Sequence, residues 1–151
     1  KEDKYVISNK VIDNFTFPFA IETPVEIGKK NQTLEKIITN KGDRETGFLI
    51  EIQANGDVLN PVIYNRDTGE YIGVDIPLID GDRLYINTVE GSKGAILFRD
   101  GIEQNVFNYV KQNSTWLQLE TGDTVFTYSS EEDTKDNMEV VFHYNTLYDS
   151  F

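Results

Sequence analysis

His143 is the only histidine in this chain of 151 residues, which also contains no cysteine, so it is the first residue to test for catalysis. A catalytic imidazole needs a nucleophile or a carboxylate partner, and none is recognisable beside His143 in the sequence. The Gly-x-Ser-x-Gly pattern of a nucleophile elbow is also missing. We therefore expect no catalytic residues, and we expect His143 to face solvent on the polar side of a strand.

Metal and cofactor sites have equally little support in the sequence. One histidine and no cysteine leave too few soft ligands for zinc. The acidic loop 129–137 offers oxygen ligands of the kind that calcium takes, but it lacks the spacing of a calcium loop, so we expect a solvated loop. The run 91–94 is better explained as a turn than as a phosphate-binding loop. We expect no metal and no cofactor.

Aromatic side chains are the remaining candidates for a binding site. In the segment 114–119, Trp116 falls on the less apolar side of an extended chain, while the two leucines share the other side. Trp116, Tyr64 and Tyr71 are therefore candidate contacts for a glycan or a partner protein. The alternative is that all three rings belong to the core, where a sandwich needs large apolar side chains.

The charge of the chain limits its partners. Its net charge is −12 and its pI is about 4.4, so it repels phosphate backbones and anionic lipid surfaces. No apolar run reaches the ~20 residues that a membrane-spanning helix needs. We expect neither nucleic-acid binding nor membrane insertion. A glycoside-acting enzyme, which would rest only on the 26 acidic residues, is the weakest alternative.

The elements that must position these residues are predicted to be strands. Large apolar residues alternate with smaller or polar ones along Phe15–Ile21 and Met138–Asn145, which is typical of half-buried strands. The short stretch Thr33–Ile38 is either a helical turn or a strand. Further strands are predicted at Phe48–Gln53, Val58–Tyr64, Tyr71–Leu78, Arg83–Thr88, Ala95–Arg99, Val106–Tyr109, Trp116–Gln118 and Thr124–Tyr128.

Turn residues separate these strands every 8–12 residues or so, as in sandwiches and barrels. Asp100-Gly101 supplies residues that tolerate positive φ, and Asn65–Gly69 is predicted to be a five-residue hairpin loop. The polar loop 129–137 is predicted to join the last two strands as a hairpin. We expect one all-β domain, an antiparallel β-sandwich over residues 15–151, preceded by an arm or linker at 1–14. Because the chain opens without methionine, we expect it to continue a missing N-terminal region.

From Asn40 to Tyr148 a series of turn and strand motifs follows in a fixed order: Asn40–Asp43, Asn60-Pro61, Asn65 with Thr68-Gly69-Glu70, Gly81–Thr88, Trp116–Asp123, the final strand Val140–Asn145 and Tyr148. In this order they resemble the C-terminal domain of siphophage-type distal tail proteins, the Dit or phage tail component family. Where family members often have Asp, this chain has Asn87, and it has Thr121-Gly122-Asp123 where Pro-Gly-Asn is common.

The resemblance implies a galectin-like jelly roll without catalytic residues. It implies a structural domain of a virion protein at the tail tip or baseplate of a phage or prophage, made in the bacterial cytoplasm, with other tail and baseplate proteins as partners. It also implies that a part of the complete protein outside this chain forms a homo-oligomeric ring. The alternative function is a carbohydrate-binding module that contacts host cell-wall glycans.

Overall fold

The structure is a computed structural model that describes residues 23–28 and 35–144, with the side chains of residues 37–144. The predicted arm at 1–14, the predicted strand Phe15–Ile21 and the family position Tyr148 lie outside the described residues.

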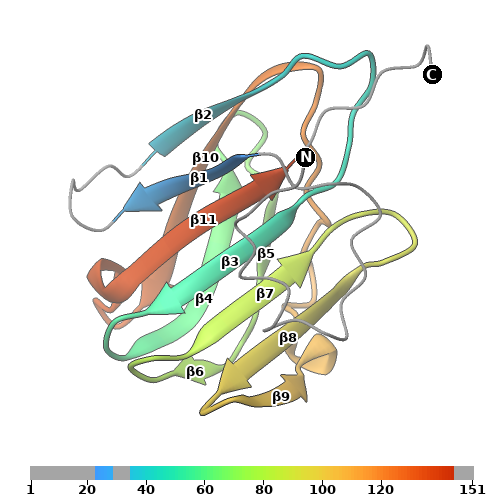
Figure 1. Cartoon of the computed structure of the whole chain (residues 1–151). Helices are drawn as coiled ribbons and strands as arrows, with labels where there is room; N and C mark the ends of the chain where they lie inside the picture. The colour runs from blue at the N-terminus through green and yellow to red at the C-terminus, as the bar shows by residue number, and fades with distance from the viewer. Residues whose placement is uncertain (1–22, 29–34, 145–151) are drawn as a thin grey trace.

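Two antiparallel sheets lie one behind the other (Figure 1). The five-stranded sheet runs in the order β2 (Glu35–Asn40), β10 (Gly122–Glu131), β4 (Val58–Asn65) and β5 (Tyr71–Gly73), with β6 (Pro77–Leu78) also paired to β4. The six-stranded sheet runs in the order β1 (Thr23–Gly28), β11 (Met138–Tyr144), β3 (Leu49–Ala54), β7 (Arg83–Asn87), β8 (Gly94–Arg99) and β9 (Ile102–Asn105).

The core lies between the two sheets because alternate residues of each strand point inward. Phe126 of β10 and Phe142 of β11 meet across the sandwich with ring centroids 5.1 Å apart, and Phe48 lies 5.4 Å from Phe126. All three rings are fully buried. Burial of one such side chain contributes about 1.5–3 kcal/mol. The expectation of an all-β antiparallel sandwich is confirmed.

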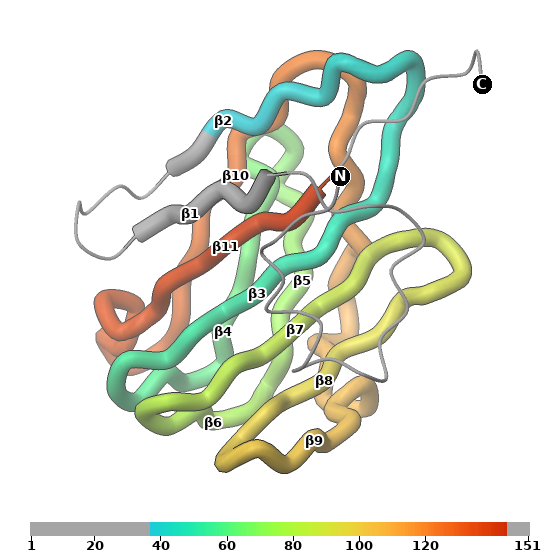
Figure 2. Tube along the Cα trace, viewed as in Figure 1, coloured from blue at the N-terminus to red at the C-terminus, as the bar shows by residue number. Residues whose placement is uncertain are grey.

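The last two strands do not form the predicted hairpin. β10 pairs with β2 and β4, whereas β11 pairs with β1 and β3, so each strand is inserted in a different sheet. The polar loop between them crosses from one layer to the other and contains the short 3-10 helix η3 (Lys135–Asn137), as the tube in Figure 2 shows. A polar loop between two strands cannot distinguish these connections, because both need only exposed turn residues.

Three strand predictions need correction. The predicted strand Tyr71–Leu78 is two short strands, β5 and β6. The predicted strand Val106–Tyr109 is instead occupied by the 3-10 helix η2 (Phe107–Tyr109), which starts where Asn105 Oδ1 accepts the Phe107 N–H at 2.8 Å. The strand in this region is β9, immediately before it. No strand covers Trp116–Gln118.

Several turn predictions are confirmed. Asp100 and Gly101 both have positive φ, 54° and 77°, and they join β8 to β9 as a two-residue hairpin turn requires. Gly69 has φ 80° and closes the loop that begins at Asn65, which donates its N–H to Glu70 O and accepts from Gly69 N. For the ambiguous stretch Thr33–Ile38, the strand alternative is correct from Glu35 onward, where β2 begins.

Candidate functional site

Tyr64 and Tyr71 lie side by side on the five-stranded sheet. They are direct partners in the register of β4 and β5, and their ring centroids are 5.8 Å apart. Their neighbours Ile63 and Ile72 are fully buried, so the two tyrosines point away from the core and are half-buried. The structure therefore brings together two of the three aromatic residues selected from the sequence.

Trp116 lies in a separate pair, with a residue that the sequence did not single out. Its ring stacks on Phe107 with centroids 5.9 Å apart and an interplanar angle of 13°. Leu117 and Leu119 are buried as predicted, while Trp116 is half-buried and packs against the edge of the core. Phe107 remains 48% exposed, and its partner in η2, Tyr109, is 51% exposed. We call Phe107, Tyr109 and Trp116 the aromatic edge.

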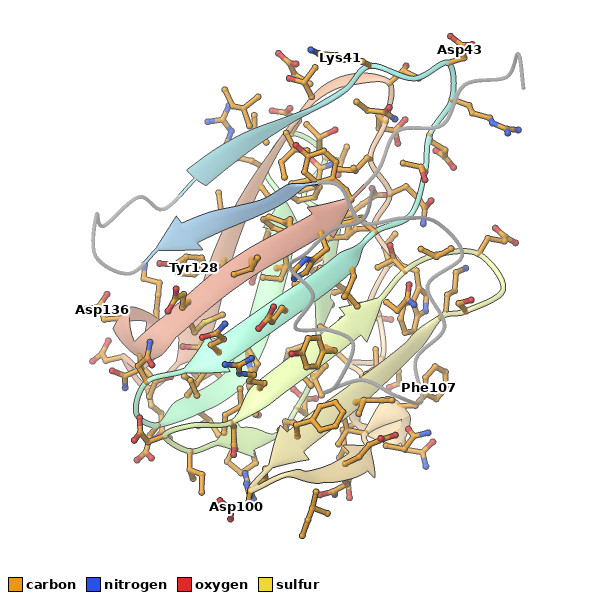
Figure 3. All side chains as sticks on the ribbon, viewed as in Figure 1. Lys41, Asp43, Asp100, Phe107, Tyr128 and Asp136 are labelled. Carbon is orange, nitrogen blue, oxygen red and sulfur yellow. The ribbon has the colours of Figure 1, made fainter. Side chains whose placement is uncertain are left out.

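The aromatic edge is held in place by backbone hydrogen bonds to the β5 region. Tyr109 O accepts from Asp75 N, Lys111 N donates to Gly73 O, and Thr115 N donates to Tyr71 O at 2.7 Å. The Lys111 ammonium also pairs with the Asp75 carboxylate, and this hydrogen bond raises the pKa of Lys111. These bonds fix the backbone of the segment that follows η2, and so hold Phe107 in place beside β8 and β9. Figure 3 shows Phe107 at the margin of the molecule.

The strand β9, next to the aromatic edge, is a second candidate for contact with a partner. It is the last strand of its sheet, and three of its four residues are exposed, including Ile102 at 69%. Within the described ranges it pairs with β8 alone. An edge strand of this kind presents backbone N–H and C=O groups to a partner chain. β9 is followed at once by η2, which carries Phe107 and Tyr109 of the aromatic edge, so β9 and the aromatic edge form one candidate contact surface.

His143 is not exposed to solvent, contrary to the sequence expectation. It is 2% exposed, and its Nε2 lies 2.9 Å from Oε1 of Glu51, which is 1% exposed. The side of β11 that carries His143 also carries the buried Val141, so this side of the sheet is not a polar, solvated one. The prediction failed because a strand's polar alternation shows only which residues share a face, and not whether that face is covered.

Glu51 is the centre of a small polar network on this face. Its Oε2 accepts from Gln53 Nε2 at 2.8 Å and lies 3.6 Å from Arg83 Nη1. Tyr85 is its cross-strand partner on β7, and burial, followed by the Glu51 carboxylate, raises the pKa of the Tyr85 hydroxyl, while Arg83 opposes the shift. The signal that could have revealed the network is a charged residue inside the apolar run Phe48–Ile52.

Both members of the His143–Glu51 pair are buried, and His143 Nδ1 has no hydrogen-bond partner in the described part of the chain. The loop carboxylates 131–133 are exposed. Across residues 23–28 and 35–144, no group of three or more His, Asp or Glu residues is placed to hold a metal ion. No helix in those ranges is long and apolar enough to span a membrane.

Comparisons with known proteins found a matching family and a similar solved structure. Residues 41–148 match the model of the family described as siphovirus-type tail component, C-terminal domain. The chain is also similar to the solved structure of the Dit protein (gp 19.1) of SPP1, described as a paradigm of the hub adsorption apparatus in phages that infect Gram-positive hosts. The TM-score is 0.60 at 11% identity, and the match covers 80% of this chain and 45% of that one. A comparison with curated proteins found no match.

Proposed function

Because this chain belongs to the siphovirus-type tail component family, of which it carries the C-terminal domain, we propose that it is the domain of a distal tail protein that holds neighbouring tail or baseplate proteins at the tail tip. The match covers about half the length of the SPP1 protein, so ring formation by a region outside this chain is part of the same proposal. A galectin-like jelly-roll topology is likewise proposed for the sandwich.

The observation that supports a contact role is the aromatic edge beside β9. A large ring that is half exposed yet stacked and rigidly positioned can be buried by a partner with little loss of side-chain entropy. Aromatic residues of this kind are enriched among the residues that carry most of the binding energy in protein interfaces. Among the described strands β9 is the last of its sheet, and an edge strand can offer backbone groups to the same partner.

Immunogold electron microscopy of the virion tests the location. Antibodies against this domain should label one end of the tail, at the tip. Labelling along the whole tail tube, or no labelling of intact and detergent-opened virions, would contradict the proposal.

A pair of variants in the phage tests the contact surface. Phe107→Ala should reduce binding to the adjoining tail-tip protein by about 30-fold, because loss of one buried aromatic anchor costs about 2 kcal/mol. Ile37→Ala, which removes an exposed apolar side chain from β2, is the matched control and should leave binding unchanged. Equal binding by the two variants would remove the aromatic edge from the interface.

Carbohydrate binding is the second candidate, favoured by the exposed ring of the Phe107–Trp116 stack. Aromatic faces stack on the apolar faces of sugars, and Trp116 is close enough to contribute. Titration with purified host cell-wall polysaccharide distinguishes the two functions. Binding that is lost in Phe107→Ala and retained in Ile37→Ala would favour the glycan, whereas no heat of binding with the wild-type domain would exclude it.

A further inference from the structure

Asn55 and Gly56 are the only Asn-Gly pair in the sequence, and they lie in the turn between β3 and β4. This turn crosses from the six-stranded sheet to the five-stranded sheet, at the end of the sandwich that also carries the β10–β11 loop (Figure 1). Asn55 is exposed, and Gly56 has a positive φ of 137°. The turn therefore presents a side-chain amide beside a backbone nitrogen that no side chain of its own residue shields.

The backbone N–H of Gly56 is not used in the fold. Across residues 23–28 and 35–144 it donates no hydrogen bond, although the neighbouring Asn55 N donates to Asn137 O at 2.8 Å. The Gly56 nitrogen can therefore approach the Asn55 side chain without the loss of a hydrogen bond.

The other asparagines that the structure describes are each held in a way that Asn55 is not. The residues that follow six of them donate their N–H groups to carbonyl oxygens: Arg66, Thr88, Val106, Tyr109, Ser114 and Met138. Pro61, which follows Asn60, has no N–H. Asn40 is buried, and hydrogen bonds hold both the nitrogen and the oxygen of its side chain.

We propose that Asn55 is a site of spontaneous covalent modification, at which the side-chain amide is converted to an acid. The Gly56 nitrogen loses its proton and bonds to Asn55 Cγ, the Cγ–Nδ2 bond breaks, and Nδ2 leaves as ammonia with that proton. The product is a succinimide ring. Water then opens the ring at one of its two carbonyls, which gives aspartate or isoaspartate. The net reaction consumes one water, releases one ammonia and oxidises nothing.

The modification weakens the contact between the β3–β4 turn and the β10–β11 loop. Asn55 Nδ2 lies 3.5 Å from Glu139 Oε1, so an acidic oxygen in its place repels the Glu139 carboxylate. Isoaspartate also lengthens the main chain between Asn55 N, which is bonded to Asn137, and Asp57 O, which accepts from Asn137 Nδ2 at 2.7 Å. This inference is independent of the proposed function.

Peptide mass spectrometry of the folded domain, incubated at mildly alkaline pH, tests the proposal. The peptide that contains Asn55 should gain the mass difference between an amide and an acid, and an isoaspartate methyltransferase should label it. Conversion at Asn55 should be several times faster than at Asn113, which is also exposed and precedes the small residue Ser114. No conversion at Asn55, or equal rates at the two sites, would overturn the proposal.

Incubation in guanidinium chloride separates the effect of the fold from that of the sequence. In the folded domain Ser114 N donates to Lys111 O at 3.1 Å, and unfolding releases this N–H. The rate at Asn113 should then rise, so the ratio of the Asn55 rate to the Asn113 rate should fall. A ratio that is unchanged or larger after unfolding would show that hydrogen bonding in the fold does not select Asn55.

Two variants complete the test. Asn55→Gln should remove the modification from this peptide and unfold at the wild-type midpoint of urea. Asn55→Asp supplies the new charge from the start and should unfold at a lower midpoint. A mass gain that persists in the Asn55→Gln peptide would show that Asn55 is not the modified residue, and equal midpoints for the two variants would contradict the repulsion from Glu139.

Discussion

His143 Nε2 lies 2.9 Å from Glu51 Oε1 at the boundary between β11 and β3, with both side chains almost completely buried. A carboxylate oxygen only accepts, so this geometry has the imidazole N–H donating to Glu51. Two polar side chains can be buried together when each provides the hydrogen-bond partner of the other, since a buried polar group without a partner is destabilising.

We predict strong energetic coupling between these two residues. Glu51→Leu and His143→Leu should each lower the free energy of unfolding by about 1–3 kcal/mol, because each leaves a buried polar partner unsatisfied. The double variant should be less destabilised than the sum of the two, with a coupling of about 0.5–3 kcal/mol. Urea unfolding of the four proteins in this cycle measures the coupling. Additive effects would show that the 2.9 Å contact contributes nothing.

Asp82 is predicted to be a stability residue of the β6–β7 turn. It is 2% exposed, accepts from Arg99 Nε at 3.0 Å and from Arg99 Nη2 at 2.6 Å, and also accepts from Ile79 N at 2.8 Å. The hydrogen bonding between Arg99 and the Asp82 carboxylate raises the pKa of Arg99. Asp82→Ala should lower the free energy of unfolding by about 1.5–3 kcal/mol, because these bonds are charge-assisted.

The matched control for Asp82 is its exposed neighbour in the same turn. Asp80→Ala should change the free energy of unfolding by less than about 0.5 kcal/mol, as surface substitutions usually do. Equal midpoints of chemical unfolding for the two variants would contradict the structural role of Asp82.

Gly47 is predicted to tolerate no side chain. A Cβ at this position would lie 2.5 Å from Val89 Cα and 2.7 Å from Thr88 O, both of which are backbone atoms. Gly47→Ala should therefore lower the free energy of unfolding by about 1–3 kcal/mol through overpacking. Thermal unfolding measures the loss.

Gly91 provides a contrast, because glycine is favoured there by the backbone conformation and not by a lack of space for a side chain. Its φ is 85° and nothing lies within 4 Å of the Cβ position. Gly91→Asn should be close to wild type, because asparagine accepts a left-handed backbone. Gly47→Asn should be at least as unstable as Gly47→Ala. Rescue by asparagine at position 47 would show that steric crowding is not the cause.

Tyr85 is predicted to make the fold sensitive to alkaline pH. Burial is the main cause that raises its pKa above the ordinary value of 10.0, so the folded state favours the neutral phenol. Stability from this group is complete below the ordinary tyrosine pKa and is lost as the pH rises above it. Tyr85→Phe should therefore lose less stability than wild type between neutral and strongly alkaline pH. Parallel loss of stability in both proteins, measured by urea unfolding at each pH, would contradict this assignment.

The sequence alone predicted most of the described strands, several turns and the family-like order of motifs, because these depend on local chemistry. The alternation in Met138–Tyr144, the positive φ of Asp100 and Gly101, and the loop from Asn65 to Gly69 each act over a few residues. The choice of Trp116 as a candidate contact also came from local alternation. Its stacking partner Phe107 was missed because it lies nine positions earlier along the chain, in a 3-10 turn.

Only the tertiary structure decided which residues meet and which faces are covered. The insertion of β10 and β11 into different sheets pairs Glu51 with His143 across 92 positions of sequence, and no local pattern contains that distance. Alternation along β11 divides its residues into two faces but says nothing about what lies against either face. The physical reason is that burial is a property of packed layers, whereas φ preferences and side-chain alternation belong to each strand by itself.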